Sequence, residues 1–195
     1  MHLRAPRWLL IGTSLMGVCT PCLPLMGSAP EETEILAGML ISPIWASSLR
    51  LTFNYAGVFM RDTWPLTLAG REYPGWDWVG EVFAADVVDG FGHELAGSSL
   101  LARRSFGSRS RPWRLYVQGG FGVLYSDAYR DPRQQQLGEA VEFKSSVDVG
   151  IQLRPWRRWC LAGELMFNHI SDASLSPRNK GVSTLGLGAG LVRRW

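Results

Sequence analysis

The strongest constraint on this chain is a long run in which polar and apolar residues alternate. From residue 141 to residue 153, every odd position except Ser145 is apolar, and the even positions are polar or glycine. A period of two puts these two sets on opposite faces of a β-strand. An ordinary protein core would bury the charges of the even face, such as Glu142, Lys144 and Asp148, without partners. One face must therefore meet an apolar environment and the other a polar one.

The same alternation recurs over residues 113–125, 161–171 and 183–195. These runs have about 10 to 13 residues, whereas a strand of a globular protein most often has roughly 5 to 6. About ten alternating residues per crossing is typical of an outer-membrane barrel, which closes because an open edge in lipid leaves backbone groups unpaired. We therefore predict an all-β fold, an eight-stranded antiparallel transmembrane β-barrel in the bacterial outer membrane, built from residues 30–195.

The first half of the chain is less regular. Leu51, Phe53, Tyr55 and Phe59 alternate, but the strand boundaries between residues 61 and 105 do not follow from the pattern. Aromatic residues near strand ends are expected at the two membrane interfaces: Trp45, Trp76, Trp78, Trp113, Tyr125, Trp159 and Trp195. The even positions of the second half are expected to fill the lumen with a charge network: Arg114, Glu142, Lys144, Asp148, Arg154 and Glu164.

A soluble β-sandwich or a lipocalin-like barrel would also alternate, with its apolar face inside. Parity alone does not say which face is inside. Strand length, the terminal aromatic residue Trp195 and the signs of export favour the membrane barrel. A pore is disfavoured because side chains fill the interior of an eight-stranded barrel.

The first 29 residues are predicted to be a secretory signal peptide that is removed. A basic start with Arg4 and Arg7 precedes an apolar run over residues 8–18 and small residues at 27–29. The alternative, a membrane-anchoring helix, would need a longer apolar run. Without this segment the chain carries about 18 basic against 17 acidic residues. A net charge near +1 does not indicate a nucleic-acid-binding protein.

A histidine and a serine interrupt the apolar face of residues 161–171. With both chain ends on the periplasmic side, this strand runs outward and its odd positions end with His169 and Ser171. Residues two apart share a face and lie about 7 Å apart along a strand, so the imidazole could activate the hydroxyl for acyl transfer. The alternative is that His169 belongs to the interfacial belt and Ser171 begins a loop.

The stretch FNHISDASLSPRNKGVSTLGLGAGL, followed by a terminal aromatic residue, resembles the C-terminal hairpin of the lipid A 3-O-deacylases. These are eight-stranded outer-membrane esterases that remove the acyl chain at the 3-position of lipid A. The match includes His169, Ser171, Ala173, Asn179 and Gly181, and YVQGGFGVLYSD is similar to the fifth strand of the family. The resemblance implies a His–Ser–Glu esterase without metal or cofactor. Ser171 would be the nucleophile, His169 the general base and Asn179 a residue that helps to place the oxyanion.

Two positions depart from this family pattern. Asp172 stands where the family typically has Asn, and Ser183 stands 14 residues after His169, where the resemblance implies the acid that orients the histidine. A neutral hydroxyl can hold an imidazole tautomer but does not stabilise imidazolium as a carboxylate does, a loss worth up to ~10⁴ in rate. Asp172 and Ser183 are both candidates for the orienting group.

The predicted function is hydrolysis of the 3-position acyl ester of lipid A in lipopolysaccharide. The alternative is a catalytically degenerate small barrel with a structural or surface-binding role. The expected partners are lipid A, the lipids of the outer membrane and the barrel-assembly machinery, which would recognise Trp195. A homodimer remains open.

Overall fold

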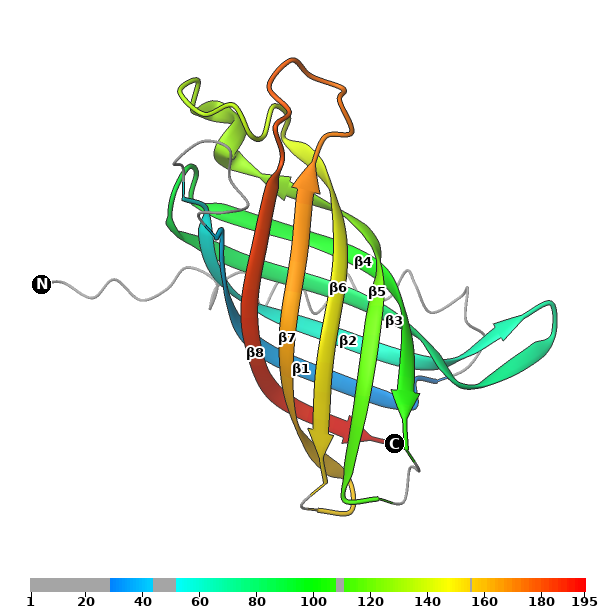
Figure 1. Cartoon of the computed structure of the whole chain (residues 1–195). Coiled ribbons are helices and arrows are strands. Elements are labelled where there is room, and N and C mark those ends of the chain that lie inside the picture. Colours follow the sequence, from blue (N-terminus) through cyan, green and yellow to red (C-terminus); the bar gives the residue numbers. More distant parts are fainter. Residues whose placement is uncertain (1–28, 44–51, 108–110, 155) are drawn as a thin grey trace, which may run out of the picture.

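Eight antiparallel strands close into one barrel in the computed structural model, which describes residues 29–43, 52–107, 111–154 and 156–195 (Figure 1). The strands are β1 (Glu32–Ile41), β2 (Asn54–Leu68), β3 (Arg71–Asp89), β4 (Glu94–Phe106), β5 (Trp113–Ser126), β6 (Val141–Leu153), β7 (Trp159–Ser171) and β8 (Val182–Arg194). Each strand pairs with its neighbours in sequence, and β8 closes the barrel against β1. The predicted eight-stranded antiparallel barrel is confirmed. The proposed signal segment, apart from Ala29, lies outside the described residues, as do Leu51 and Trp45.

The two ends of the barrel differ in their connections. The start of β1 and the end of β8 meet at one end, where Glu32 pairs with Arg194. The long connections 127–140 and 172–181 lie at the other end (Figure 1). Outer-membrane barrels have short periplasmic turns and longer extracellular loops. We therefore call the end with the two long loops the outer end and the end with the strand termini the periplasmic end.

The wall of the barrel is apolar on the outside and polar on the inside in the second half of the chain. Along β6 and β7 the odd residues are mostly exposed and the even residues are buried. Val147, for example, is 55% exposed whereas Asp148 is 1% exposed. A soluble barrel has the reverse distribution, so the lipocalin-like alternative is wrong. Among the described residues, no helix is long and apolar enough to cross a membrane.

Aromatic side chains fill the outer half of the lumen. Phe53, just before β2, and Tyr55 and Phe59 of β2 are buried, and the ring of Phe59 stacks on that of Phe83 with centroids 5.7 Å apart. Leu137 from the β5–β6 loop is 1% exposed and belongs to the same cluster, so this loop contributes to the packing at the outer mouth. In β2 the odd positions therefore face the lumen, the opposite parity to that of β6 and β7.

A charge network lies next to these rings and extends toward the periplasmic end of the lumen. The Arg61 guanidinium lies 2.7 Å from Glu81 and 2.7 Å from Glu164, and the Lys144 ammonium lies 2.6 Å from the other oxygen of Glu81. Asp148 lies 3.5 Å from Arg61. Buried ion pairs of this kind specify register and packing more surely than they stabilise the fold.

The predicted network members divide into two groups. Arg114, Lys144, Asp148 and Glu164 point into the lumen as expected, and Arg114 pairs with Glu32 at 2.7 Å. Glu142 and Arg154 do not join the network, and this part of the prediction is wrong. Glu142 lies at the outer end, where it accepts the backbone N–H of Glu139, and Arg154 follows the end of β6. The alternation pattern predicts whether a side chain points into the lumen or outward, but it does not predict the position of the residue along the barrel axis.

Candidate functional site

His169 lies on the outward face of β7 between two serines of the neighbouring strands. Ser145 of β6 and Ser183 of β8 are its direct cross-strand partners. The Nδ1 atom of His169 lies 2.9 Å from the Oγ of Ser183. When the Ser183 hydroxyl accepts the Nδ1 proton, Nε2 keeps the lone pair that a general base needs. This row of three polar side chains interrupts the apolar wall near the outer end of the barrel.

A glycine allows the imidazole to lie close to the start of β8. Gly181 has a φ of +67°, and a Cβ at this position would lie 2.9 Å from Cε1 and 3.1 Å from Nε2 of His169. Both the backbone conformation and the space therefore favour glycine here. The Cε1–Nε2 edge of the ring therefore lies beside Gly181, just before the start of β8.

Ser171 is the last residue of β7 and is half-buried on the same outward face as His169. Within the described ranges its hydroxyl makes no hydrogen bond, and it is not hydrogen-bonded to His169. Catalytic hydrogen bonds are often long in a free enzyme and tighten when substrate binds. In this geometry Nδ1 of His169 is hydrogen-bonded to Ser183. The hydroxyl of the neighbouring Ser171 is free to rotate.

Asp172 is not brought to His169. Its side chain is fully buried, as its inward parity predicts, and its carboxylate accepts the backbone N–H groups of Leu175 at 3.2 Å and Ser176 at 2.9 Å. The carboxylate therefore shapes the β7–β8 loop. Ser183 and Asp172 were the two candidates for the group that orients His169, and only Ser183 contacts the imidazole. Among the described residues, no carboxylate is hydrogen-bonded to this imidazole.

Asn179 folds back over the same loop. Its Oδ1 accepts the backbone N–H of Asp172 at 3.1 Å, while its Nδ2 makes only a long contact of 3.5 Å with Ser174 Oγ. The amide N–H groups are thus still able to serve another acceptor. Ala173 and Ser174 adopt φ values of 55° and 68°, in the left-handed region that non-glycine residues uncommonly adopt. Sequence reasoning missed this strain because the loop offers no glycine at either position.

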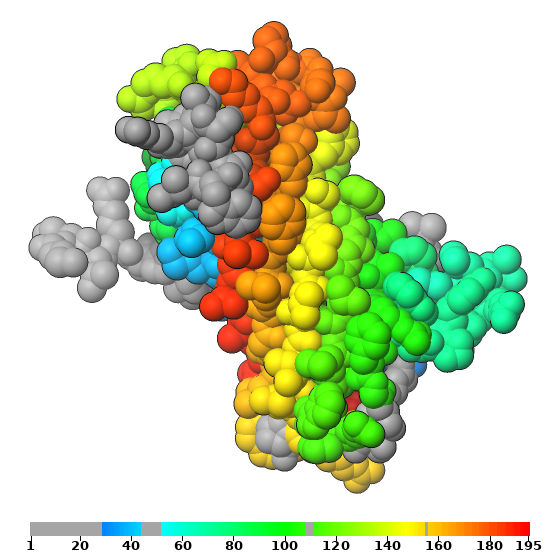
Figure 2. Space-filling view, viewed as in Figure 1, coloured from blue at the N-terminus to red at the C-terminus, as the bar shows by residue number. Residues whose placement is uncertain are grey.

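The β5–β6 loop supports the β7–β8 loop, and the two lie together above the wall (Figure 2). The Arg178 guanidinium donates to the backbone carbonyls of Tyr129 at 3.1 Å and Asp131 at 3.3 Å. Gly181 donates its backbone N–H to the carbonyl of Gln136 at 3.1 Å. The loop that carries the site is therefore fixed by a segment about 45 residues away in sequence, which no local pattern predicts.

Two carboxylates, Asp131 and Asp127, accept hydrogen bonds that hold the β5–β6 loop in shape. Hydrogen bonds from the side chain and the backbone N–H of Arg133 lower the pKa of Asp131 to about 2. Burial raises the pKa of Asp127, but the backbone N–H groups of His93 and Glu94 outweigh it, and the net pKa is lowered. Both carboxylates stay ionised at neutral pH. In the described part of the chain, no group of three or more His, Cys, Asp or Glu side chains could hold a metal ion.

Residues 48–192 match the model of a protein family described as lipid A 3-O-deacylase (PagL). The chain belongs to this family. The expectation drawn from the C-terminal hairpin is confirmed at the level of the family, and the match extends from before β2 to two residues before the end of β8. A search of curated proteins found no significant match.

Three solved structures share the fold. The outer-membrane enzyme PagL has a TM-score of 0.59 at 12% identity, with 80% of this chain and 97% of that chain covered. Neisserial surface protein A (NspA) has a TM-score of 0.60 at 12% identity, covering 84% and 96%. The N-terminal barrel domain of Pseudomonas aeruginosa OprF has a TM-score of 0.51 at 15% identity, covering 85% and 99%. At these identities the likeness establishes the fold, that of an outer-membrane barrel.

His169 has a serine beside it on each neighbouring strand. The orienting position is filled by the neutral Ser183, which touches Nδ1, and Ser145 flanks the ring from the other side. Ser145 is the one polar residue on the odd face of β6, a signal visible in the sequence. Its position beside His169 became evident only from the strand register.

Proposed function

We propose that this protein is an outer-membrane serine esterase that hydrolyses the 3-position acyl ester of lipid A. The observation that carries the proposal is the outward imidazole of His169, whose Nδ1 is held by Ser183, with the unbonded hydroxyl of Ser171 on the same face. A polar pair on the lipid-facing wall near the outer end is accessible to an ester that is itself embedded in the outer leaflet. Membership of the deacylase family supports the same substrate.

The reaction follows the serine-esterase sequence. Ser171 Oγ attacks the ester carbonyl carbon while Nε2 of His169 takes the hydroxyl proton. The tetrahedral intermediate collapses, the bond to the sugar oxygen breaks, and His169 returns the proton to that oxygen. A water molecule, deprotonated by the same nitrogen, then attacks the acyl-serine. The 3-hydroxy fatty acid is released and Ser171 regains its proton.

Two further residues have defined roles in this proposal. Asn179 donates an N–H of its side-chain amide to the oxyanion of the tetrahedral intermediate, since its Oδ1 is engaged but its Nδ2 is held only by a 3.5 Å contact. Ser183 keeps the proton of His169 on Nδ1 but contributes no negative charge. The rate is therefore expected to fall below that of a site with a carboxylate, by up to ~10⁴.

One observation favours a second candidate function, a barrel that has lost catalysis. Among the described residues, no carboxylate bonds His169, so the imidazolium that forms during attack lacks its usual stabilisation. Such a barrel would act in envelope structure or in binding at the cell surface.

The experiment that separates the two functions is mass spectrometry of lipid A. A Gram-negative host without its own deacylase would express the parent protein, Ser171→Ala or Ser98→Ala in matched amounts. Ser98 is an outward-facing hydroxyl on β4 and serves as the matched control. We expect loss of one 3-hydroxyacyl chain with the parent and the control but not with Ser171→Ala. Unchanged lipid A with all three folded proteins, both in membranes and after purification in detergent, would favour the non-catalytic barrel.

A further inference from the structure

The two ends of the barrel carry opposite charge. Outside the lumen, the described residues of the periplasmic end include eight arginines and three carboxylates: Arg71, Arg104, Arg111, Arg154, Arg157, Arg158, Arg193 and Arg194, with Glu31, Asp62 and Glu72. Outside the lumen, the described residues of the outer end include four cations and six carboxylates: Arg130, Arg133, Arg178 and Lys180, with Asp86, Asp89, Glu94, Asp127, Asp131 and Glu139. The excess positive charge therefore faces the periplasmic leaflet.

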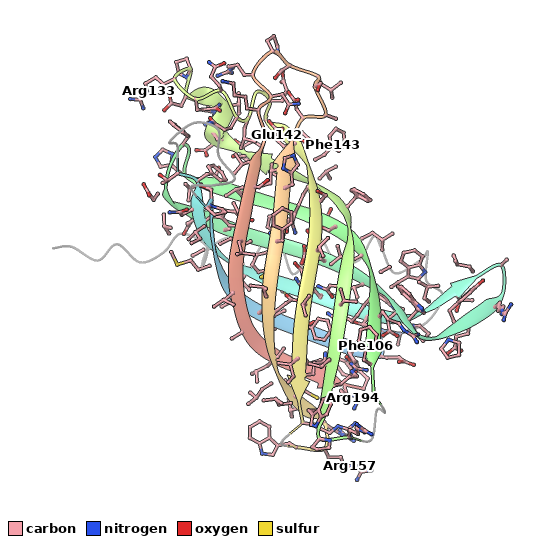
Figure 3. The ribbon with its side chains drawn as sticks, viewed as in Figure 1. Phe106, Arg133, Glu142, Phe143, Arg157 and Arg194 are labelled. Carbon is pink, nitrogen blue, oxygen red and sulfur yellow. The ribbon has the colours of Figure 1, made fainter. Side chains whose placement is uncertain are left out.

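The β6–β7 turn concentrates this charge beside a cavity. A cavity of about 450 Å³ at the rim is lined by Glu31, Glu32, Arg157, Arg158, Arg194 and Trp195. Glu32 is already paired with Arg114 at 2.7 Å and with Arg194 at 3.1 Å. The side chains of Arg157 and Arg158 are exposed and bond no group among the described residues. Figure 3 shows Arg157 and Arg194 at the same end of the barrel, far from Arg133 and Glu142.

Aromatic rings mark the height in the membrane of two other arginines at this end, Arg193 and Arg111. The Arg193 guanidinium lies 3.7 Å from the ring centroid of Trp195, and that of Arg111 lies 5.8 Å from the ring of Trp113. Tryptophan side chains prefer the headgroup level of a bilayer. The guanidinium groups beside them therefore stand at the level of the lipid phosphates.

The wall above the turn is suited to acyl chains. Leu153, Leu161 and Leu191 are paired across β6, β7 and β8 in one register, and each is between 42% and 47% exposed. A lipid whose phosphate occupies the rim cavity would lay its chains across this row. The arginines at the rim would thus meet the headgroup of a phospholipid, and the leucines above them would meet its acyl chains.

We propose that the cavity between the β6–β7 turn and the end of β8 binds the phosphate of an anionic glycerophospholipid of the periplasmic leaflet. The guanidinium groups of Arg157 and Arg158 donate to the phosphate oxygens, a geometry for which arginine is well suited. Clusters of basic residues next to a membrane-spanning segment attract anionic lipids, with each arginine contributing to the affinity. This site is separate from the proposed esterase site, which lies at the opposite end of β7.

Lipid binding can be tested on the folded full barrel in neutral maltoside micelles. Equal amounts of phosphatidylglycerol and phosphatidylcholine with the same chains are added, and native mass spectrometry counts the lipid that each protein retains. The test variant is Arg157→Gln/Arg158→Gln, and the matched control is Arg130→Gln/Arg133→Gln at the outer end. Heat-modifiable migration on gels confirms that each variant is folded.

We expect the parent and the control to prefer phosphatidylglycerol and the test variant to lose roughly 30-fold of that preference, as two arginines at a membrane surface would supply. Equal retention of the two lipids by the parent would overturn the proposal, as would an equal loss in the control variant. A third arm adds inorganic phosphate at the concentration of the lipid. Complete displacement of the lipid would assign the cavity to free phosphate and would also overturn the proposal.

Discussion

Restoring a carboxylate at Ser183 should activate the esterase. Ser183 Oγ lies 2.9 Å from Nδ1 of His169, on the strand directly paired with it, so Ser183→Glu places a negative charge beside the imidazole. A carboxylate at this point in a serine-hydrolase site is worth up to ~10⁴ in rate. A misplacement of about 1 Å costs about 10²-fold. The gain expected from an introduced, unoptimised glutamate is therefore about 10²-fold in kcat/KM.

The companion variant Ser183→Ala should have a much smaller effect. It removes one neutral hydrogen bond, worth about 0.5 to 1.5 kcal/mol, which corresponds to a loss of about 2- to 10-fold in rate. A carboxylate near the membrane interface costs the barrel about 1 kcal/mol or less, so Ser183→Glu should still fold. The expected order of activity is Glu above Ser above Ala.

The assay is release of the 3-hydroxy fatty acid from lipid A by purified protein in detergent, followed by mass spectrometry. Ser145→Glu is the matched control, because Ser145 flanks the same histidine from β6 without bonding it. Equal activation by Ser145→Glu would mean that any nearby negative charge suffices and that the bond to Nδ1 is irrelevant. Folded Ser183→Glu and Ser183→Ala proteins that both match the parent would refute the role of Ser183.

Three further predictions concern the supports of the site and the lumen. Arg61→Ala should lower the free energy of unfolding by about 3 to 5 kcal/mol, measured by urea titration in micelles, because it leaves buried carboxylates unpaired; a change below 1 kcal/mol would contradict this. Gly181→Ala should reduce lipid A deacylation by about 10²-fold, since the added Cβ would press on the His169 ring, and activity equal to that of the parent would show that the ring can move aside. Arg178→Ala frees the β7–β8 loop from the carbonyls of the neighbouring loop and should lower kcat about tenfold with a folded barrel, whereas a change in KM alone would point to substrate binding instead.

The second half of the barrel was predictable because its two faces differ in polarity. In β6 the odd residues face lipid and the even residues carry Glu142, Lys144 and Asp148, so alternation defines the strand and its faces together. In β2 both faces are largely apolar: Val58 and Met60 point outward while Phe59 points into the lumen. When both faces of a strand are apolar, hydropathy does not show which face points into the lumen. The inward aromatic cluster was therefore not predictable.

The pairing of charges in the lumen was also not predictable from the sequence. The sequence identified the cations and carboxylates of β5, β6 and β7 but not their partners on β1 to β4, among them Glu34, Arg61, Glu81 and Arg103. Arg61, Glu81 and Arg103 come from the region between residues 61 and 105, where the pattern left the strand boundaries undefined. Their pairing depends on the height of each residue in the barrel, which closure and register determine.

The sequence alone determined the face on which His169, Ser171 and Ser183 lie, because the side chains of a strand alternate with an invariant period of two. It also determined that Asp172 points inward. Only the tertiary structure decided that Ser183, and not Asp172, touches the imidazole, and that Ser145 flanks it from β6. Only the tertiary structure decided that a loop around residue 135 holds the loop of the site. The physical reason is that parity is a property of one strand, whereas contact between strands depends on how closure sets each register against the next.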